Sequence, residues 1–243
     1  MNADEYQVND IFTSIQGEGY WTGRRATFIR LQGCPVGCSW CDAGPNYHPD
    51  TEVFTQLSGN DPVPMHVPSQ GNTWGKGGTR MTVDEIMVQV KSEYVVITGG
   101  EPMIWNLDPL LERLLFNYVS IETSGLNWYK GLLGADWITW SPKENLGWDA
   151  PIEFYQHASE LKWVVDEALQ YETVTRVWNK CLLQSAASIN PYAKVPFNYL
   201  MPEGCPPSPA MVAKALGFLE QNFTHPVGRW RFGDRLQYRI GVK

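Results

Sequence analysis

Short apolar runs recur along the chain, separated by polar or amphipathic segments. Each run spans five or six residues and is rich in β-branched or aromatic side chains, which favours buried strands. The runs are 26–31, 94–98, 118–122, 136–140, 161–165 and 197–201. Because amphipathic segments alternate with these runs, the pattern predicts an α/β fold with parallel strands.

Four of the intervening segments are candidate helices. Thr82 is a plausible N-cap with Glu85 three residues later, which is the capping-box pattern. Asp108 is a second candidate N-cap, and Pro109 follows at the first helical position. The predicted helices span 82–91, 106–116, 171–184 and 208–223.

The segment 44–80 interrupts the alternation of predicted strands and helices, because it is rich in Pro, Gly, Asn and Ser. A loop of this length inside a compact domain is typical of a functional insertion or a lid over a site. We therefore predict a single domain over 1–243, with an insertion at about 44–80 after a cysteine-rich loop.

Polar or glycine-rich motifs follow five of the six predicted strands. In parallel α/β folds, ligands bind at the carboxyl ends of the strands. The sequence therefore predicts one composite site at that edge. The motifs are the cysteine loop 33–42 and the segments 99–102, 122–125, 141–143 and 202–204.

The charge and the termini limit the class of protein. A net charge of −7 argues against a protein that binds nucleic acid over its whole surface. The basic tail 229–243 is interpreted as a solvated strand edge. The first ten residues are polar and acidic, unlike a secretory signal, and no run of about 18 apolar residues is present, so we expect a cytoplasmic protein without membrane segments.

Three cysteines lie within eight residues, as Cys34, Cys38 and Cys41. In a reducing compartment, such a cluster indicates metal binding or catalysis before disulfides. A structural zinc site uses four ligands, whereas three thiolates suit an iron–sulfur cluster with one open iron. Thiolates bind both metals, so their softness does not decide between them. A fourth zinc ligand would have to be His48, Cys181 or Cys205.

This spacing resembles the signature of radical S-adenosylmethionine enzymes. Trp40 takes the aromatic position before the last cysteine, and the motif 99–102 matches the segment that holds the amino group of S-adenosylmethionine. The resemblance implies a 4Fe-4S cluster on the three cysteines, S-adenosylmethionine on the remaining iron, and an incomplete parallel (β/α)6-type barrel.

The resemblance narrows to the 7-carboxy-7-deazaguanine synthase family. The segment 11–42 is similar to its N-terminal region, and the motifs at 95–102, 121–125, 140–143 and 200–204 follow in the same order. This resemblance implies a lyase that converts 6-carboxy-5,6,7,8-tetrahydropterin to 7-carboxy-7-deazaguanine and ammonia, in the route to queuosine and related deazapurines.

The family implies two groups of site residues. Gln16, Glu18 and Arg30 would be catalytic, and a guanidinium fork suits the substrate carboxylate. These residues could instead have only structural roles, as a glycine turn at 16–19 and a strand-end ion pair at Arg30. Substrate contacts would come from Ile15, Gln16, Gly17, Arg30 and Thr98. Cofactor contacts would come from Trp40, Cys41, Asp42, Gly100, Glu101, Ser124, Ser141, Pro142, Lys143, Met201, Pro202, Glu203 and Gly204.

The chain departs from the family at Ala43. Many members carry Thr or Ser there, and its hydroxyl binds Mg²⁺, which alanine cannot do. Asp42 or Asn46 could supply an oxygen instead, because Mg²⁺ takes mostly water and substrate ligands. Dependence on Mg²⁺ is therefore open.

The resemblance also implies partners. The substrate is a small pterin, the electron donor is flavodoxin- or ferredoxin-like, and similar enzymes are homodimers. Two alternatives share some features: an enzyme that makes a glycyl radical on a partner protein, and a zinc-binding module without catalysis. The first would not be expected to carry the motif at 14–19.

Overall fold

The computed structural model describes residues 5–41, 78–187, 195–222 and 229–242. The chain divides into two compact units, one formed by Met1–Ser14 and Arg25–Trp137 and the other by Ile15–Arg24 and Ile138–Lys243. In the described ranges, no helix is long and apolar enough to span a membrane.

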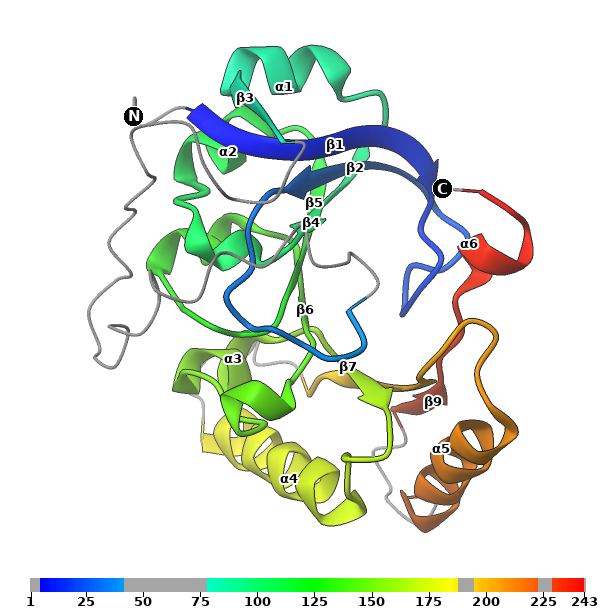
Figure 1. Cartoon of the computed structure of the whole chain (residues 1–243). Helices are drawn as coiled ribbons and strands as arrows, with labels where there is room; N and C mark the ends of the chain where they lie inside the picture. Colours follow the sequence, from blue (N-terminus) through cyan, green and yellow to red (C-terminus); the bar gives the residue numbers. More distant parts are fainter. Residues whose placement is uncertain (1–4, 42–77, 188–194, 223–228, 243) are drawn as a thin grey trace. The chain divides into compact units, whose positions relative to one another are not determined.

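The first unit is built on the strand order β3-β1-β2-β4-β5 (Figure 1). Strands β2, β4 and β5 run parallel, and β3 is antiparallel to β1. Two helices, α1 and α2, pack against each other. The elements are β1 (Glu5–Ile15), β2 (Arg25–Leu31), β3 (Thr79–Thr82), α1 (Val83–Gln89), β4 (Tyr94–Gly99), η3 (Pro102–Ile104), α2 (Asp108–Arg113), β5 (Tyr118–Thr123) and η4 (Lys130–Gly134).

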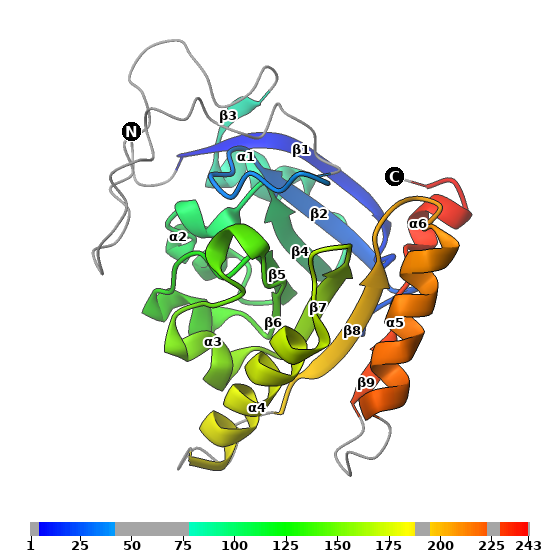
Figure 2. The same ribbon diagram turned by 60° about the horizontal axis from the view of Figure 1, so that its bottom comes forward.

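The second unit is built on the parallel strands β6-β7-β8-β9. Helix α5 packs along β8 and β9, and α3 packs on α4 (Figure 2). The elements are β6 (Trp137–Trp140), η5 (Glu144–Leu146), α3 (Ile152–His157), β7 (Glu160–Val165), α4 (Tyr171–Ala187), β8 (Phe197–Pro202), α5 (Pro209–Asn222), β9 (Trp230–Phe232) and α6 (Leu236–Arg239).

All six predicted strands are present, which confirms the α/β class with mainly parallel strands. β3 is an edge strand of the first unit and β9 an edge strand of the second, so the described strands form an open sheet and not a closed barrel. Strands β1 and β3 were not predicted. Strand β9 lies within the tail 229–243 that we interpreted as a solvated strand edge, and it is an edge strand. The predicted insertion is described only from residue 78 onward, and its last two residues, Thr79 and Arg80, belong to β3.

The helix signals have mixed outcomes. Thr82 caps α1 as predicted, because its hydroxyl accepts from the Glu85 amide while the Glu85 carboxylate accepts from the Thr82 amide. The prediction that Asp108 caps α2 is wrong. Leu107 already has helical φ and ψ and is the N-cap, and the Asp108 amide donates to Asn106 Oδ1 at 3.1 Å.

Each unit has its own core. In the first unit, Val95, Val96 and Ile97 of β4 are fully buried. In the second, Trp140 and Trp163 are fully buried on β6 and β7. Strands β4 and β6 carry the motifs 99–102 and 141–143 at their carboxyl ends, so rigid elements support these candidate site residues.

Candidate active site

In the first unit, the cysteine loop packs directly on the glycine motif that follows β4. The Gly100 amide donates to the Leu31 carbonyl at 3.0 Å, and the Glu101 amide donates to the Gly33 carbonyl at 2.8 Å. A Cβ on Gly100 would lie 2.0 Å from the Gly33 oxygen. This backbone approach is possible only for glycine. The two predicted cofactor motifs are therefore in contact.

The Glu101 carboxylate is buried and receives four donors. Oε1 accepts from the Met103 amide at 2.9 Å and from Thr123 Oγ1 at 2.6 Å. Oε2 accepts from the Ser124 amide at 2.7 Å and also from the Ser124 hydroxyl. The carboxylate joins the ends of β4 and β5, and it already has as many partners as its oxygens usually accept.

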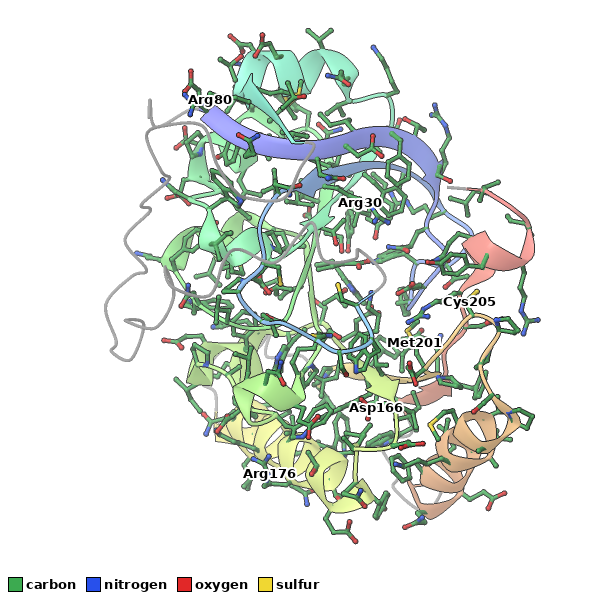
Figure 3. All side chains as sticks on the ribbon, in the orientation of Figure 1. Arg30, Arg80, Asp166, Arg176, Met201 and Cys205 are labelled. Atoms are coloured by element: carbon green, nitrogen blue, oxygen red, sulfur yellow. The ribbon has the colours of Figure 1, made fainter. Side chains whose placement is uncertain are left out.

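Arg30 and Thr98 lie opposite each other on β2 and β4, so both are on the same face of this pair of strands. The Arg30 guanidinium lies over the Phe12 ring, 5.5 Å from its centroid. Arg30 Nε is buried and has no hydrogen-bond partner among the described residues. Figure 3 shows Arg30 on β2, ahead of the cysteine loop. A buried donor without a partner is a candidate contact for an anionic ligand.

The three cysteine thiols belong to one loop but have different surroundings. Cys34 is buried, whereas Cys38 and Cys41 are half-buried. Burial raises the pKa of the Cys34 thiol to about 12, and the nearby Glu101 carboxylate adds to this effect. A thiolate at this position therefore needs a cation beside it, which a bound iron would provide.

The arrangement of possible metal ligands bears on the choice between a cluster and a single ion. No three His, Cys, Asp or Glu side chains in the described ranges are grouped closely enough to hold one metal ion. In a cluster each thiolate binds its own iron, so the three sulfur atoms need not converge on one point. The two described candidates for a fourth zinc ligand are Cys181, which is buried in α4, and Cys205, which is exposed. His48, Asp42, Ala43 and Asn46 lie outside the described residues.

In the second unit, residues 16–24 form a closed turn after β1. The Gln16 amide donates to the Arg24 carbonyl at 2.7 Å, and the Glu18 amide donates to Gln16 Oε1 at 3.1 Å. Gly19 has φ +69°, and a Cβ there would lie 2.3 Å from Glu160 Oε1. The glycine turn that the sequence analysis offered as a structural role is thus present. It fixes the Gln16 and Glu18 side chains.

Glu18 is the most heavily paired of the predicted catalytic residues. Its Oε2 lies 2.9 Å from Lys162 Nζ on β7, and its Oε1 accepts from Gln237 Nε2 at 3.0 Å. Arg235 Nε lies 3.7 Å from Oε1. Burial raises the pKa of Glu18, but Lys162, Arg235 and Gln237 outweigh this effect and hold the pKa below its ordinary value. Glu18 is therefore ionised at neutral pH.

These three partners were missed in the sequence. The sequence could have pointed to Lys162, because it is the one charged residue inside the apolar run 161–165. Arg235 and Gln237 belong to the tail that we interpreted as solvated. That interpretation is wrong for Arg235, whose side chain is only 15% exposed. Its position follows from a long-range ion pair, which sequence spacing does not show.

The remaining predicted cofactor motifs are also in the second unit. Ser141 Oγ donates to the Lys162 carbonyl at 2.7 Å and accepts from Lys143 Nζ. Met201, Pro202 and Gly204 line a cavity of about 500 Å³ at the end of β8. Met201 and Cys205 lie at this end of β8 (Figure 3).

Known proteins show what this chain is related to. No protein-family model matches it. The 7-carboxy-7-deazaguanine synthase of Escherichia coli K12 is 37% identical over 179 residues, which cover 70% of this chain and 76% of the relative. The chain belongs to the 7-carboxy-7-deazaguanine synthase family. The relative of the same name from Synechocystis is 36% identical over 168 residues, 67% of this chain and 66% of the relative.

A solved structure extends the likeness to nearly the whole chain. The crystal structure of QueE from Escherichia coli matches with a TM-score of 0.63 and 26% identity, covering 94% of this chain and 93% of that one. The family predicted from the cysteine loop and the later motifs is thereby confirmed, and so is the prediction that the protein is an enzyme of deazapurine biosynthesis.

Proposed function

We propose that this protein converts 6-carboxy-5,6,7,8-tetrahydropterin to 7-carboxy-7-deazaguanine and releases ammonia. Family membership supports the reaction. The single observation that carries it is Arg30, whose buried Nε lacks a partner among the described residues. Arg30 lies beside Thr98 and four residues before Cys34. A planar fork of this kind matches the substrate carboxylate.

Three thiols and the adjoining glycine motif fit the cofactors of this reaction. Cys34, Cys38 and Cys41 would hold a 4Fe-4S cluster, and Gly100, Glu101 and Ser124 would lie beside S-adenosylmethionine. When bound, these groups supply the one-electron chemistry that removes a hydrogen atom from the substrate. Because four protein donors already occupy Glu101, we expect it to shape the loop around the cofactor more than to bind the ammonium directly.

The residues of the chain bind and orient the substrate. Arg30 would anchor the carboxylate, with Thr98 beside it. Gln16 and Glu18 would accept from the polar N–H edge of the pterin, because a pterin presents amide and amino donors there. Ser141, Lys143 and the segment Met201–Gly204 would complete the cofactor site. The fold expected for such an enzyme is an incomplete (β/α)6-type barrel in one domain.

The remaining features complete the proposal. Mg²⁺ would bind with Asp42 or Asn46 in place of the hydroxyl that Ala43 lacks. A flavodoxin- or ferredoxin-like donor would supply the electron, the protein would act in the cytoplasm, and it would be a homodimer.

Turnover of S-adenosylmethionine tests this proposal. Reconstituted anaerobically with iron and sulfide, and given a reductant, the enzyme should form 5′-deoxyadenosine faster when carboxytetrahydropterin is present. Arg30→Met should raise KM for the pterin at least tenfold, because it removes a charge-assisted anchor. Arg25→Met is the matched control on the exposed start of β2 and should behave like wild type. Pterin-independent turnover, or equal behaviour of the two variants, would contradict the proposal.

A further inference from the structure

The C-terminal segment 234–239 lies directly against the turn that carries Gln16 and Glu18. The Leu236 amide donates to the Gly17 carbonyl at 3.0 Å. A Cβ on Gly17 would lie 1.6 Å from Gln237 Oε1 and 2.9 Å from the Gln237 backbone nitrogen. Glycine at position 17 therefore allows a contact that any other residue would disrupt, and the turn and the segment are packed as one piece.

Glu18 joins this segment to strand β7. Lys162 and Gln237 each make a hydrogen bond to a different oxygen of its carboxylate, at 2.9 Å and 3.0 Å. Arg235 lies 3.7 Å from the same oxygen as Gln237. The side chains of Glu18, Lys162 and Arg235 are 16%, 11% and 15% exposed, so solvent screens these interactions little. The carboxylate is held from two sides in one orientation.

The network still has hydrogen-bonding capacity. Arg235 Nε and Gln237 Oε1 are buried and have no hydrogen-bond partner among the described residues. A carboxylate accepts about four hydrogen bonds, and only two are made to Glu18 by described side chains. A purely structural ion-pair network would be expected to satisfy its own buried atoms. The unmet capacity instead points to a polar ligand at this turn.

We propose that Lys162, Arg235 and Gln237 are positioning residues that hold Glu18 for the pterin, and that the C-terminal segment is thereby part of the substrate site. This inference rests on the proposed function. The ligand chemistry is the N–H edge of the pterin ring, which an ionised carboxylate accepts from. Arg235 also donates to the Gly204 carbonyl at 3.4 Å, so the same segment reaches the loop after β8.

A double-mutant cycle on the reconstituted enzyme tests the inference. The probe is 6-carboxypterin, an oxidised analogue, whose binding is measured by calorimetry without S-adenosylmethionine. Gln237→Ala should weaken binding about tenfold, and it should raise KM for the substrate while kcat changes less than about threefold. Glu18→Gln should weaken binding at least as much. The double variant should be no weaker than Glu18→Gln alone, because Gln237 acts through Glu18.

Two controls accompany the cycle. Gln221→Ala, on the exposed face of α5, should leave binding unchanged. Lys162→Arg should retain binding within a few fold whereas Lys162→Met should not, because only the arginine keeps a cation beside Glu18. Unfolding midpoints of each variant show whether it is folded at the assay temperature.

Several results would overturn the inference. They are unchanged binding in Gln237→Ala, additive losses in the double variant, or a Gln237→Ala effect on kcat alone. In each case wild-type turnover would leave the proposed function standing. A wild-type enzyme that neither binds 6-carboxypterin nor uses the pterin substrate would overturn the proposed function and this inference with it.

Discussion

Glu101 shows how one buried carboxylate organises the cofactor motif. Its two oxygens accept from two backbone amides and two hydroxyls, contributed by η3 and by the end of β5. A buried charge is tolerated only when it is well hydrogen-bonded, and this one is. The motif that resembles a cofactor-binding segment is therefore also a structural joint between two strand ends.

Replacing this carboxylate by an amide should destabilise the first unit. In Glu101→Gln, the amide nitrogen must face protein donors, which leaves at least one buried donor unpaired. We expect the free energy of unfolding to fall by about 2–4 kcal/mol. Urea denaturation measures it, with the exposed Glu112→Gln in α2 as the matched control. A loss under about 0.5 kcal/mol would show that the four bonds matter little.

Glu18 should make the stability of the second unit depend on pH. Its folded-state pKa is below the ordinary value, so its stabilisation is complete above the ordinary pKa and is lost as the pH falls through the folded-state pKa. At pH 7, Glu18→Gln should cost about 2 kcal/mol of unfolding free energy. The difference from wild type should shrink below about pH 4. A difference that stays constant from pH 7 to 3.5 would contradict the ion pair.

At the scale of elements, the cysteine loop is positioned by its packing against the glycine motif after β4. The glycine motif after β4 lies against the cysteine loop so closely that a Cβ on Gly100 would meet the Gly33 oxygen at 2.0 Å and Cys34 Cβ at 3.0 Å. Backbone atoms cannot move aside as a flexible side-chain end can. The glycines are therefore required by the approach of two strand ends, whatever they also contact.

A methyl group at this point should disturb the metal site. Gly100→Ala should lower the iron bound per chain after reconstitution to less than half of wild type and reduce stability by about 2 kcal/mol or more. Iron analysis and the absorbance near ~400 nm measure the first effect. Gly217→Ala in α5 is the control, because a Cβ there meets nothing within 4 Å; it should bind iron normally and gain about 0.5–1 kcal/mol. Normal iron content in Gly100→Ala would contradict the packing argument.

The sequence predicted the elements with strong local signals. The buried strand β4 consists mostly of apolar residues, and the run 161–165 in β7 has one charged residue among apolar ones, so both runs were visible. The capping box at Thr82 was visible too. Strand β1 was missed because polar residues such as Gln7, Asn9 and Asp10 break its apolar pattern. Strand β3 has only four residues, too few for a periodic signal.

The candidate site residues also divide into those with a local sequence signal and those without one. Cys34, Cys38, Cys41 and the motif at 99–102 were recognisable because their spacing is local. The partners of Glu18 were not, because Lys162 and Gln237 lie 144 and 219 residues away along the chain. Contacts at such separations are set by the fold, and no local pattern records them.

At the scale of the whole molecule, each unit holds a different group of the candidate site residues. The first holds the cysteine loop, Arg30 and Glu101, and the second holds the turn 16–24, the motif 141–143 and the loop after β8. Under the proposed function, the first unit would supply the metal ligands and the anchor for the substrate carboxylate, and the second would supply acceptors for the pterin edge.

The product of the reaction tests this account most directly. Anaerobically reconstituted enzyme, reductant, S-adenosylmethionine and 6-carboxy-5,6,7,8-tetrahydropterin should yield 7-carboxy-7-deazaguanine, identified by mass spectrometry, with one ammonia released for each product. Arg30→Met should yield far less of both. Formation of 5′-deoxyadenosine without the deazaguanine would contradict the proposed reaction, because the cofactor chemistry would then be acting on a different substrate.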